Sequence, residues 1–271
     1  MEVVPPLLVG LGLLIGAYGT LIGVGGSVVL VPALMLLYPE ASPSTLTGIS
    51  LAFVFVNALS GASAYSRQRR IDYRSGIMFA LATVPGTIVG VWSASLISRD
   101  SFALVFGGLL LLFSVFLVLR PQREGPSSST CIRGTSRTLV DARGGVFVYS
   151  FDLSLGIALS SAVGFVAGLM GIGGGIIHVP ILIYLLHFPT HIATATSHFI
   201  LVFTALAGSL THAVGGTYSN SWQPLPWLAI GVIPGAWIGA WFSQKLRGGL
   251  IARLLALALA LVGVRLLLLG M

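Results

Sequence analysis

The chain is dominated by long apolar stretches that are separated by short polar ones. Four of these stretches, Leu46–Tyr65, Ile77–Ile97, Phe102–Leu119 and Ala252–Leu269, are close to the ~20 residues that cross a bilayer as a helix. They are continuously apolar and do not alternate with polar residues, which disfavours a β-barrel. The pattern predicts an all-α polytopic membrane protein.

Each half of the chain divides into five apolar elements. The second element of each half, at 27–38 and 176–187, has about 12 residues and is too short to cross a bilayer at a rise of ~1.5 Å per residue. The other expected elements are 5–22, 44–66, 75–97 and 101–119 in the first half, and 149–170, 191–213, 224–243 and 249–269 in the second.

The two halves repeat each other. The segment GVGGSVVLVP, which begins at Gly23, returns as GIGGGIIHVP; TGIS returns as TATS, and VPGTIVG as IPGAWIG, all at offsets of 147 to 149 residues. Ordered similarity at one fixed period indicates internal duplication. We therefore predict a first transmembrane repeat over 1–120, a linker over 121–147 and a second transmembrane repeat over 148–271.

The charged residues predict how the chain is oriented. Only 8% of the residues are charged, against about 25% in soluble domains. When the RQRR cluster at 67–70 and the Arg- and Ser-rich linker are placed in the cytoplasm, every basic residue except Arg99 and Arg265 falls inside, as the positive-inside rule prefers. The first two elements of each half then form a hairpin, the repeats have inverted topology, and both termini are external.

A rival interpretation treats those two elements as a single crossing. It gives parallel repeats and places either the RQRR cluster or the KLR segment at 245–247 outside, so we favour the inverted arrangement. The end of the linker, RTLVDARGGVFVYSF, has β-branched and aromatic runs around a glycine turn and predicts a short hairpin.

Several other classes of protein do not fit the chain. The N-terminal MEVVPP has no Lys or Arg, which argues against a cleaved signal peptide and for a retained first segment. Cys131 is the single cysteine, so neither a disulfide framework nor a thiolate metal cluster is expected. We expect no metal and no cofactor. The placement of the positive charge argues against a nucleic-acid partner.

The repeated glycine segments predict a binding site. Inverted repeats with short, Gly-interrupted segments at corresponding positions are typical of a transporter whose site lies near the bilayer midplane. Helices that begin at 25–27 and 173–175 would direct unpaired N–H groups and positive dipole ends at an anion. The alternative is that these glycines only allow helices to pack closely. A nucleotide phosphate loop is disfavoured, because no Lys-Ser/Thr follows.

Polar residues at the start of the third element of each half extend this candidate site. Thr47 and Ser50, like Thr194 and Ser197, are spaced i, i+3 and share a helix face, and Asn57 lies further along the first of these helices. Hydroxyl groups can donate to an oxyanion without adding fixed charge; the alternative is that each bonds a carbonyl of its own helix. The candidate substrate-binding residues are Gly25, Gly26, Ser27, Thr47, Ser50, Asn57, Gly173, Gly174, Gly175, Thr194, Ser197 and His198.

Two histidines in the second half have no histidine counterpart in the first. Because imidazole titrates near neutral pH, His178 or His198 can carry a proton coupled to transport. The alternative is a neutral histidine that only packs. No Asp, Glu, Lys or Arg is expected at a central depth, which argues against a proton pump.

These motifs resemble the TauE/SafE sulfite exporter family, also called the TSUP transporters. The similarity covers nearly the whole chain and rests on the paired glycine motifs with their trailing prolines, on TGIS, on ATATSHF at 193–199, and on the basic stretch at 67–74. It implies movement of a small sulfur-containing anion, such as sulfite, sulfoacetate or thiosulfate, across the cytoplasmic membrane, usually outward. It also implies that Gly25, Gly26, Ser27, Ser50, Gly173, Gly174, Gly175 and Ser197 surround the substrate.

The expected function is therefore that of a multi-pass transporter of the inner membrane, an exporter that works by alternating access at the repeat interface. A passive anion channel of the same architecture is the first alternative. An intramembrane enzyme is a weaker one, because Ser197 and His198 are adjacent on a helix and their side chains diverge by about 100°. The expected partners are a sulfur oxyanion or organosulfonate, the lipid bilayer and a coupled proton.

Overall fold

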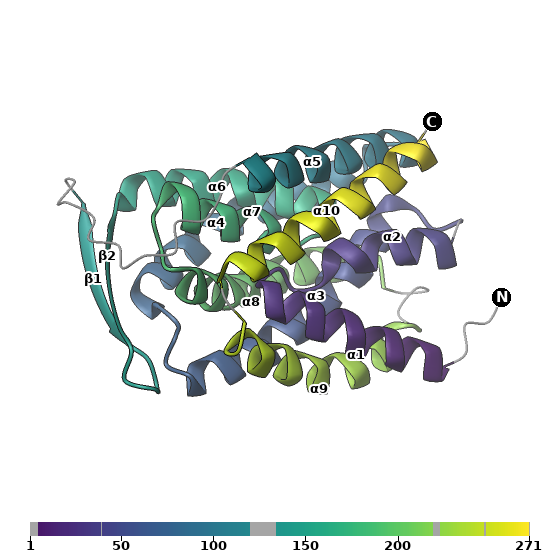
Figure 1. The fold of residues 1–271 in the computed structure, drawn as a ribbon. Coiled ribbons are helices and arrows are strands. Elements are labelled where there is room, and N and C mark those ends of the chain that lie inside the picture. The colour runs from purple at the N-terminus through teal and green to yellow at the C-terminus, as the bar shows by residue number, and fades with distance from the viewer. Residues whose placement is uncertain (1–4, 39, 120–133, 219–222, 247, 271) are drawn as a thin grey trace.

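The computed structural model describes residues 5–38, 40–119, 134–218, 223–246 and 248–270 (Figure 1). Within these residues the chain forms α-helices, one π-helical turn and one β-hairpin. The elements are α1 Pro5–Ile22, α2 Ser27–Leu37, α3 Pro43–Arg67, α4 Tyr73–Ala94, α5 Arg99–Leu119, β1 Thr135–Val140, β2 Val146–Phe151, α6 Leu153–Met170, α7 Gly175–Pro180, η1 Ile181–Leu185, α8 Thr190–Val214, α9 Leu225–Ser243 and α10 Gly248–Gly270. Most of the linker, including Cys131, lies outside the described residues.

The helices confirm the predicted class of polytopic membrane protein. Among the described residues, the six helices α1, α3, α4, α6, α8 and α9 are long and apolar enough to span a bilayer. The outer helices carry large exposed apolar side chains, such as Leu14, Leu81 and Trp92. Such a surface suits lipid, because an apolar face this extensive is not left in water.

The packing of the helices takes one partner from each half of the chain. The helices α3 and α8 lie against each other and are the most buried of the six spans, while α1 packs along α9, α4 along α6 and α5 along α10 (Figure 1). In the sequence repeat, α1 corresponds to α6 and α4 to α9, so the pair α1–α9 is the image of the pair α6–α4. This exchange of partners agrees with an internal duplication in which the two halves are related by a two-fold axis.

Repeated glycines bring the outer pairs into backbone contact. In VPGTIVG, Gly86 and Gly90 of α4 face α6, where an added Cβ would meet the carbonyl oxygens of Ser161 and Phe165. In IPGAWIG, Gly239 of α9 faces α1 and would meet the carbonyl oxygen of Ala17 in the same way. Both copies of this motif therefore let two membrane helices approach closely.

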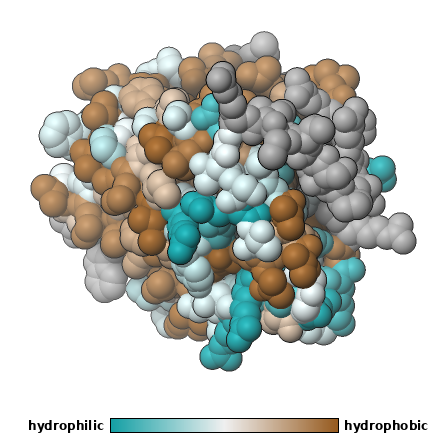
Figure 2. Space-filling view, turned by 90° about the vertical axis from the view of Figure 1, so that its left-hand side faces the viewer, coloured by the Kyte–Doolittle hydropathy of each residue, from teal (hydrophilic) through white to brown (hydrophobic). Residues whose placement is uncertain are grey.

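The predicted hairpin is present and lies across one end of the helix bundle, which we call the hairpin end (Figure 1). The strands pair antiparallel, with Thr135 opposite Phe151 and Val140 opposite Val146. Both the start of α1 and the end of α10 lie at the other end of the molecule (Figure 1). Polar residues gather in the middle of the hairpin end and are flanked by apolar ones (Figure 2).

Two predicted elements of the second half differ from the structure. The helix expected from residue 149 begins only at Leu153, because residues 149–151 belong to β2 and the Asp152 carboxylate caps α6 by accepting from the Leu155 N–H at 3.1 Å. Apolarity is continuous across this junction and hides it. The element expected at 176–187 is a turn of α-helix followed by the π-helical turn η1, in which the Leu186 N–H donates to the Ile181 carbonyl at 3.0 Å.

Candidate functional site

The two glycine motifs form short loops, each of which joins a long helix to a short one. Loop 1, residues 23–26, connects α1 to α2, and loop 2, residues 171–174, connects α6 to α7. The first, third and fourth residues of each loop are glycines with positive φ, at 83°, 81° and 83° in loop 1 and 69°, 67° and 95° in loop 2. Other residues rarely adopt this region, which explains the spacing Gly-x-Gly-Gly.

Both loops end at the start of a helix. The first hydrogen bonds of α2 and α7 end on the carbonyls of Gly26 and Gly174, at distances between 2.9 and 3.2 Å. The N–H groups of residues 27–28 and 175–176 precede these bonds and therefore have no intrahelical acceptor. They lie at the positive end of the helix dipole, the end that favours an anion.

The loops converge on one pair of apolar side chains. An added Cβ on Gly25 would lie 3.1 Å from Val54 and 3.3 Å from Leu201, and one on Gly173 would lie 2.8 Å from each. Val54 belongs to α3 and Leu201 to α8, at corresponding positions of the repeat, and both are buried. The two broken helices thus meet at the crossing of the two central helices.

Two serines connect each half to the loop of the other half. The Ser50 hydroxyl of α3 donates to the Gly171 carbonyl at 2.7 Å, and the Ser197 hydroxyl of α8 donates to the Gly23 carbonyl at 3.1 Å. Both serines are fully buried. The bonds are reciprocal, since each runs from a central helix of one half to the glycine loop of the other.

The start of α2 also reaches across to loop 2. The Ser27 hydroxyl donates to the Ile172 carbonyl at 2.9 Å. Ser27 has Gly175 as its counterpart, and there an added Cβ would lie 2.8 Å from the Cα of Val24. The two loops therefore touch each other directly, with a hydroxyl on one side and bare backbone on the other.

The two predicted threonines pack against the first glycine of each loop. An added Cβ on Gly171 would lie 2.6 Å from the Cα of Thr47, and one on Gly23 would lie 3.0 Å from the Cα of Thr194. Their hydroxyls donate to carbonyls of their own helices, at Ser44 for Thr47 and at Thr190 for Thr194, and the Thr47 Oγ1 also lies 3.3 Å from the His212 Nε2 of α8. That local bond is the alternative stated above for these hydroxyls.

Asn57 and His198 belong to one buried polar cluster beside loop 1. The Thr20 hydroxyl at the end of α1 donates to the Asn57 Oδ1 at 2.9 Å, and the His198 Nε2 lies 3.2 Å from the same hydroxyl oxygen. The Asn57 Nδ2 is buried and has no hydrogen-bond partner among the described residues. A buried donor of this kind is costly unless it is used, so Asn57 is a candidate to bind a ligand.

His178 lies away from this cluster. Its Nε2 is 3.2 Å from the Ser160 hydroxyl of α6, and the side chain is buried on the first turn of α7. The residues that meet around the loops are Gly25, Gly26, Ser27, Ser50, Gly173, Gly174, Gly175 and Ser197, with Thr47, Thr194, Asn57 and His198 around them.

Three residues of this region are absent from the sequence prediction. Val54 and Leu201 correspond in the repeat, but an apolar pair inside an apolar helix gives no signal. Thr20 joins Asn57 to His198, and its counterpart in the repeat is Gly168, so no repeated polar position marks it.

The chain also resembles known proteins. Residues 8–266 match the family model described as "Sulfite exporter TauE/SafE". A "Probable membrane transporter protein YunE" of Bacillus subtilis is 34% identical and covers 96% of each chain. A "Probable membrane transporter protein" of Haemophilus influenzae is 29% identical and covers 83% of this chain and 80% of its own length. A "Probable membrane transporter protein MJ0441" of Methanocaldococcus jannaschii is 24% identical and covers 89% of this chain and 87% of its own length. No solved structure matches the chain.

Apolar spanning helices that surround two broken helices are typical of a membrane transporter, and the names of the relatives agree. The protein is a membrane transporter. With a match over nearly its whole length, the chain belongs to the TauE/SafE sulfite exporter family.

Proposed function

We propose that this transporter exports a small sulfur-containing oxyanion, sulfite or an organosulfonate, across the cytoplasmic membrane by alternating access between its two halves. The observation that carries the proposal is the reciprocal pair of bonds from Ser50 to Gly171 and from Ser197 to Gly23. These bonds place two donors at the point where both broken helices meet. The family supplies the class of substrate.

The chemistry of the site suits an oxyanion that must also be released. Two helix N-termini and the hydroxyls of Ser27, Ser50 and Ser197 provide donors without a fixed positive charge. A hydrogen bond from a neutral donor to an anion is worth about 1.5–3 kcal/mol, so several of them can bind an oxyanion without a fixed positive charge to hold it in place. An arginine at the same place would bind it through stronger charge-assisted bonds.

In the structure the hydroxyls are bonded to loop carbonyls, and Val54 and Leu201 fill the space between the loops. Substrate entry would exchange these internal bonds for bonds to the oxyanion, as one loop moves away from the other. The contact between the loops is then the closed state of the site, and opening alternates between the two ends of the molecule.

We assign proton coupling to His198 rather than to His178. His198 shares the Thr20 hydroxyl with Asn57, whose buried Nδ2 has no hydrogen-bond partner among the described residues. His178 lies beside loop 2, but within the described part of the chain its ring bonds only Ser160 of α6. A proton on His198 would therefore act on the candidate ligand donor Asn57 through Thr20. His198→Gln should abolish the stimulation of transport by a pH gradient, and a fully retained stimulation would remove this assignment.

A passive channel is the main alternative. The touching loops and the buried Val54 and Leu201 favour a carrier, because a channel needs a continuous path. Saturation of flux and counterflow of labelled substrate separate the two. An enzyme is disfavoured, because the Ser197 hydroxyl bonds the Gly23 carbonyl while the His198 ring bonds Thr20.

The test is sulfite efflux from proteoliposomes, with sulfoacetate, thiosulfate, sulfate and chloride as competitors. We compare the wild type with the double variant Ser50→Ala/Ser197→Ala. Loss of two donors to an anion should lower flux about 10-fold or more, since each such bond is worth about 1.5–3 kcal/mol. Sulfur oxyanions, but not chloride, should compete.

The matched control is Ser63→Ala/Ser161→Ala, which removes two exposed hydroxyls that bond only the Leu59 and Ile157 carbonyls of their own helices. This control should transport like the wild type. Unchanged flux in a folded Ser50→Ala/Ser197→Ala protein would reject the site, and a folded wild type that moves none of the sulfur anions would reject the substrate class.

A further inference from the structure

A second polar region lies far from the glycine loops, at the hairpin end. There a cavity of about 350 Å³ lies between the end of α3, the end of α9 and the turn of the hairpin. Three arginines line it, together with Gln68 and Trp237. Arg67 ends α3, Arg70 lies in the connection that follows it, and Arg143 lies in the hairpin turn. The proposed transport mechanism uses none of these residues.

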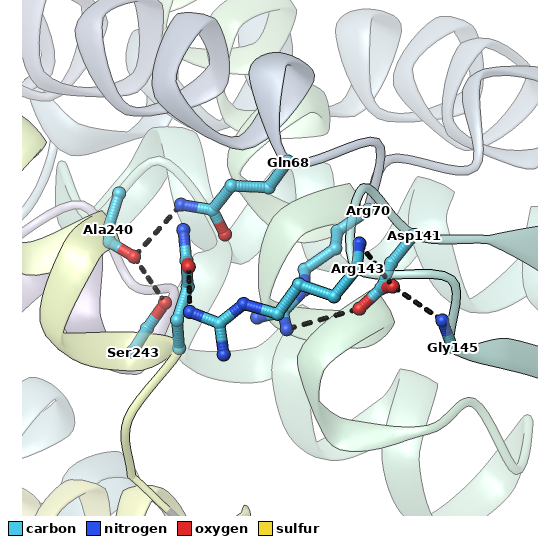
Figure 3. Close-up of polar contacts among 8 residues, drawn as sticks. Gln68, Arg70, Asp141, Arg143, Gly145, Ala240 and Ser243 are labelled. Atoms are coloured by element: carbon cyan, nitrogen blue, oxygen red, sulfur yellow. Dashed lines mark hydrogen bonds and ion pairs between the residues drawn. The ribbon is translucent and has the colours of Figure 1, made fainter.

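The cavity has more positive than negative charge. Asp141 is the carboxylate among its lining residues, and its Oδ1 accepts the backbone N–H groups of Arg143 at 2.9 Å and Gly145 at 2.8 Å (Figure 3). Burial acts to raise the pKa of Asp141, but the bonds from Gly145, Arg143 and Arg70 outweigh it and lower the pKa. The carboxylate is thus ionised and neutralises one of the three guanidinium groups.

Arg70 has donor capacity that the protein leaves unused. The residue is only 5% exposed, and its Nη2 lies 3.4 Å from the Asp141 Oδ2. Its Nη1 is buried and has no hydrogen-bond partner among the described residues. A buried guanidinium N–H without an acceptor is costly, and an anionic oxygen in the cavity would satisfy it.

Among the described residues, Gln68 has a buried acceptor that lacks a donor, whereas Arg70 has a buried donor that lacks an acceptor. The Gln68 Nε2 donates to the Ala240 carbonyl of α9 at 3.0 Å, which fixes the orientation of the amide (Figure 3). Its Oε1 is buried and accepts no hydrogen bond among the described residues. A ligand that complements the cavity therefore carries anionic oxygens that accept from Arg70 and a hydroxyl group that donates to Gln68.

We propose that this cavity binds a phosphoglycerol group, whose phosphate is held by Arg70, Arg67 and Arg143 and whose hydroxyl donates to Gln68. The proposal is independent of the proposed substrate. This chemistry occurs in the headgroup of phosphatidylglycerol and in free glycerol phosphate.

The surroundings of the cavity favour the lipid as the source. The Arg67 guanidinium lies over the Trp237 ring at 4.7 Å, and the Lys245 ammonium lies over the Trp241 ring at 3.5 Å. Both tryptophans are exposed, at 38% and 50%, and they lie on the last turns of the spanning helix α9. Tryptophans mark the membrane interface, where basic pockets between helices bind lipid headgroups.

The test measures which lipids the purified full-length protein retains, by native mass spectrometry from mixed micelles. Phosphatidylglycerol should be retained about 10-fold over phosphatidylcholine, because the choline ammonium is repelled by the arginines and has no hydroxyl to donate to Gln68. Phosphatidylmethanol has the same charge and no hydroxyl, and it should bind several-fold more weakly than phosphatidylglycerol. Equal retention of all three lipids would overturn the proposal.

The variants use exposed side chains, so that folding is preserved. Arg67→Gln/Arg143→Gln should lose the preference for phosphatidylglycerol, whereas the control Arg74→Gln, an exposed arginine of the same end outside this cavity, should keep it. A preference that survives in Arg67→Gln/Arg143→Gln would reject the site.

A soluble arm distinguishes the two sources. Glycerol 3-phosphate in millimolar excess should leave lipid retention unchanged and should not raise the melting temperature of delipidated wild type. A rise in melting temperature that Arg67→Gln/Arg143→Gln abolishes would support the phosphoglycerol site and assign it to the free ester. No effect in this arm, together with lipid retention, assigns it to the headgroup.

Discussion

At the scale of single residues, the fourth glycine of each loop can be constrained by its backbone conformation and by the space around it. Gly26 and Gly174 both have a positive φ, 83° and 95°, and a side chain in this conformation costs about 1–2 kcal/mol. Their surroundings differ, however. An added Cβ on Gly26 would lie 2.8 Å from the Ile15 carbonyl oxygen, whereas the nearest atom to one on Gly174 is the Cβ of Ala167 at 3.2 Å.

This difference predicts unequal effects of the same substitution. Gly26→Ala should destabilise the protein by the strain of the left-handed conformation and by a further ~1–3 kcal/mol of overpacking, whereas Gly174→Ala should cost little beyond the strain. The control is Gly10→Ala, at a helical position where an added Cβ meets nothing within 4 Å, and it should be neutral or slightly stabilising. Thermal unfolding in detergent measures all three, and equal losses at Gly26 and Gly174 would contradict the packing argument.

Repetition made these glycines and the serines Ser50 and Ser197 predictable. Each of them recurs at a fixed offset, so a pattern that is weak in one half becomes significant in two. Thr20, Val54 and Leu201 could not be found in this way. Their roles depend on which helices cross, and that is decided by tertiary packing rather than by the composition of one segment.

At the scale of elements, the hairpin is held at both ends by carboxylate side chains. The Asp141 carboxylate orders the turn by accepting two backbone N–H groups, and its Oδ2 faces the Arg70 guanidinium. Further along, the Tyr149 hydroxyl of β2 donates to the Asp72 Oδ2 at 2.9 Å, and Asp72 also caps α4. One end of the hairpin thus depends on Asp141 and the other on Asp72.

Acid should loosen the turn before it affects the helices. The pKa of Asp141 is lower in the folded chain than its ordinary value of 3.8, because the bonds from Gly145, Arg143 and Arg70 outweigh its burial. A group with a depressed pKa contributes stability that is complete above the ordinary value and is lost as the pH falls through the folded pKa. Hydrogen exchange at residues 141–145 should therefore accelerate, relative to the intrinsic rate, as the pH falls below about 4.

The control for this experiment is Asp141→Asn, which keeps the shape of the side chain and cannot ionise. Its turn should open more readily at neutral pH, and that opening should not change further on acidification. A turn in the wild type whose protection stays constant down to pH ~2 would show that the carboxylate is not what orders it.

The sequence predicted the helices well and the junctions less well. Hydropathy located the spans because a bilayer demands long apolar runs, and the expected bounds 44–66 and 191–213 differ from those of α3 and α8 by a single residue at each end. The expected hairpin and the expected helix overlap at 149–151, because VFVYSF and LSLGIAL are equally apolar, and these residues belong to the strand. Asp152, the helix cap between them, was the signal that locates this boundary.

At the scale of the whole molecule, the repeat shows which helices correspond to each other but not which helices are in contact. The sequence shows that α1 matches α6 and that α4 matches α9, whereas the structure shows that the contacts are α1 with α9 and α4 with α6. The halves are therefore interleaved rather than placed side by side. The ends of the bundle differ too, because one carries the hairpin and its arginines and the other carries both the start of α1 and the end of α10 (Figure 1).

The positive-inside rule predicts that the hairpin end faces the cytoplasm, and labelling of single cysteines can test it. In a Cys131→Ser background, Ala142→Cys in the exposed hairpin turn should react with a membrane-impermeant maleimide only from the cytoplasmic side. Val214→Cys, at a position that is 92% exposed at the end of α8, should react only from outside. Ala205→Cys, at a fully buried position of the same helix, is the control and should react from neither side.

The labelling pattern decides more than the orientation. Because the repeats are predicted to be inverted, the hairpin turn and the end of α8 must lie on opposite sides, and labelling of both from one side would reject that topology. Opposite labelling with the sides reversed would keep the inverted fold. It would, however, place the arginine cavity in the outer leaflet, so the phosphoglycerol headgroup that we propose for it would have to come from that leaflet.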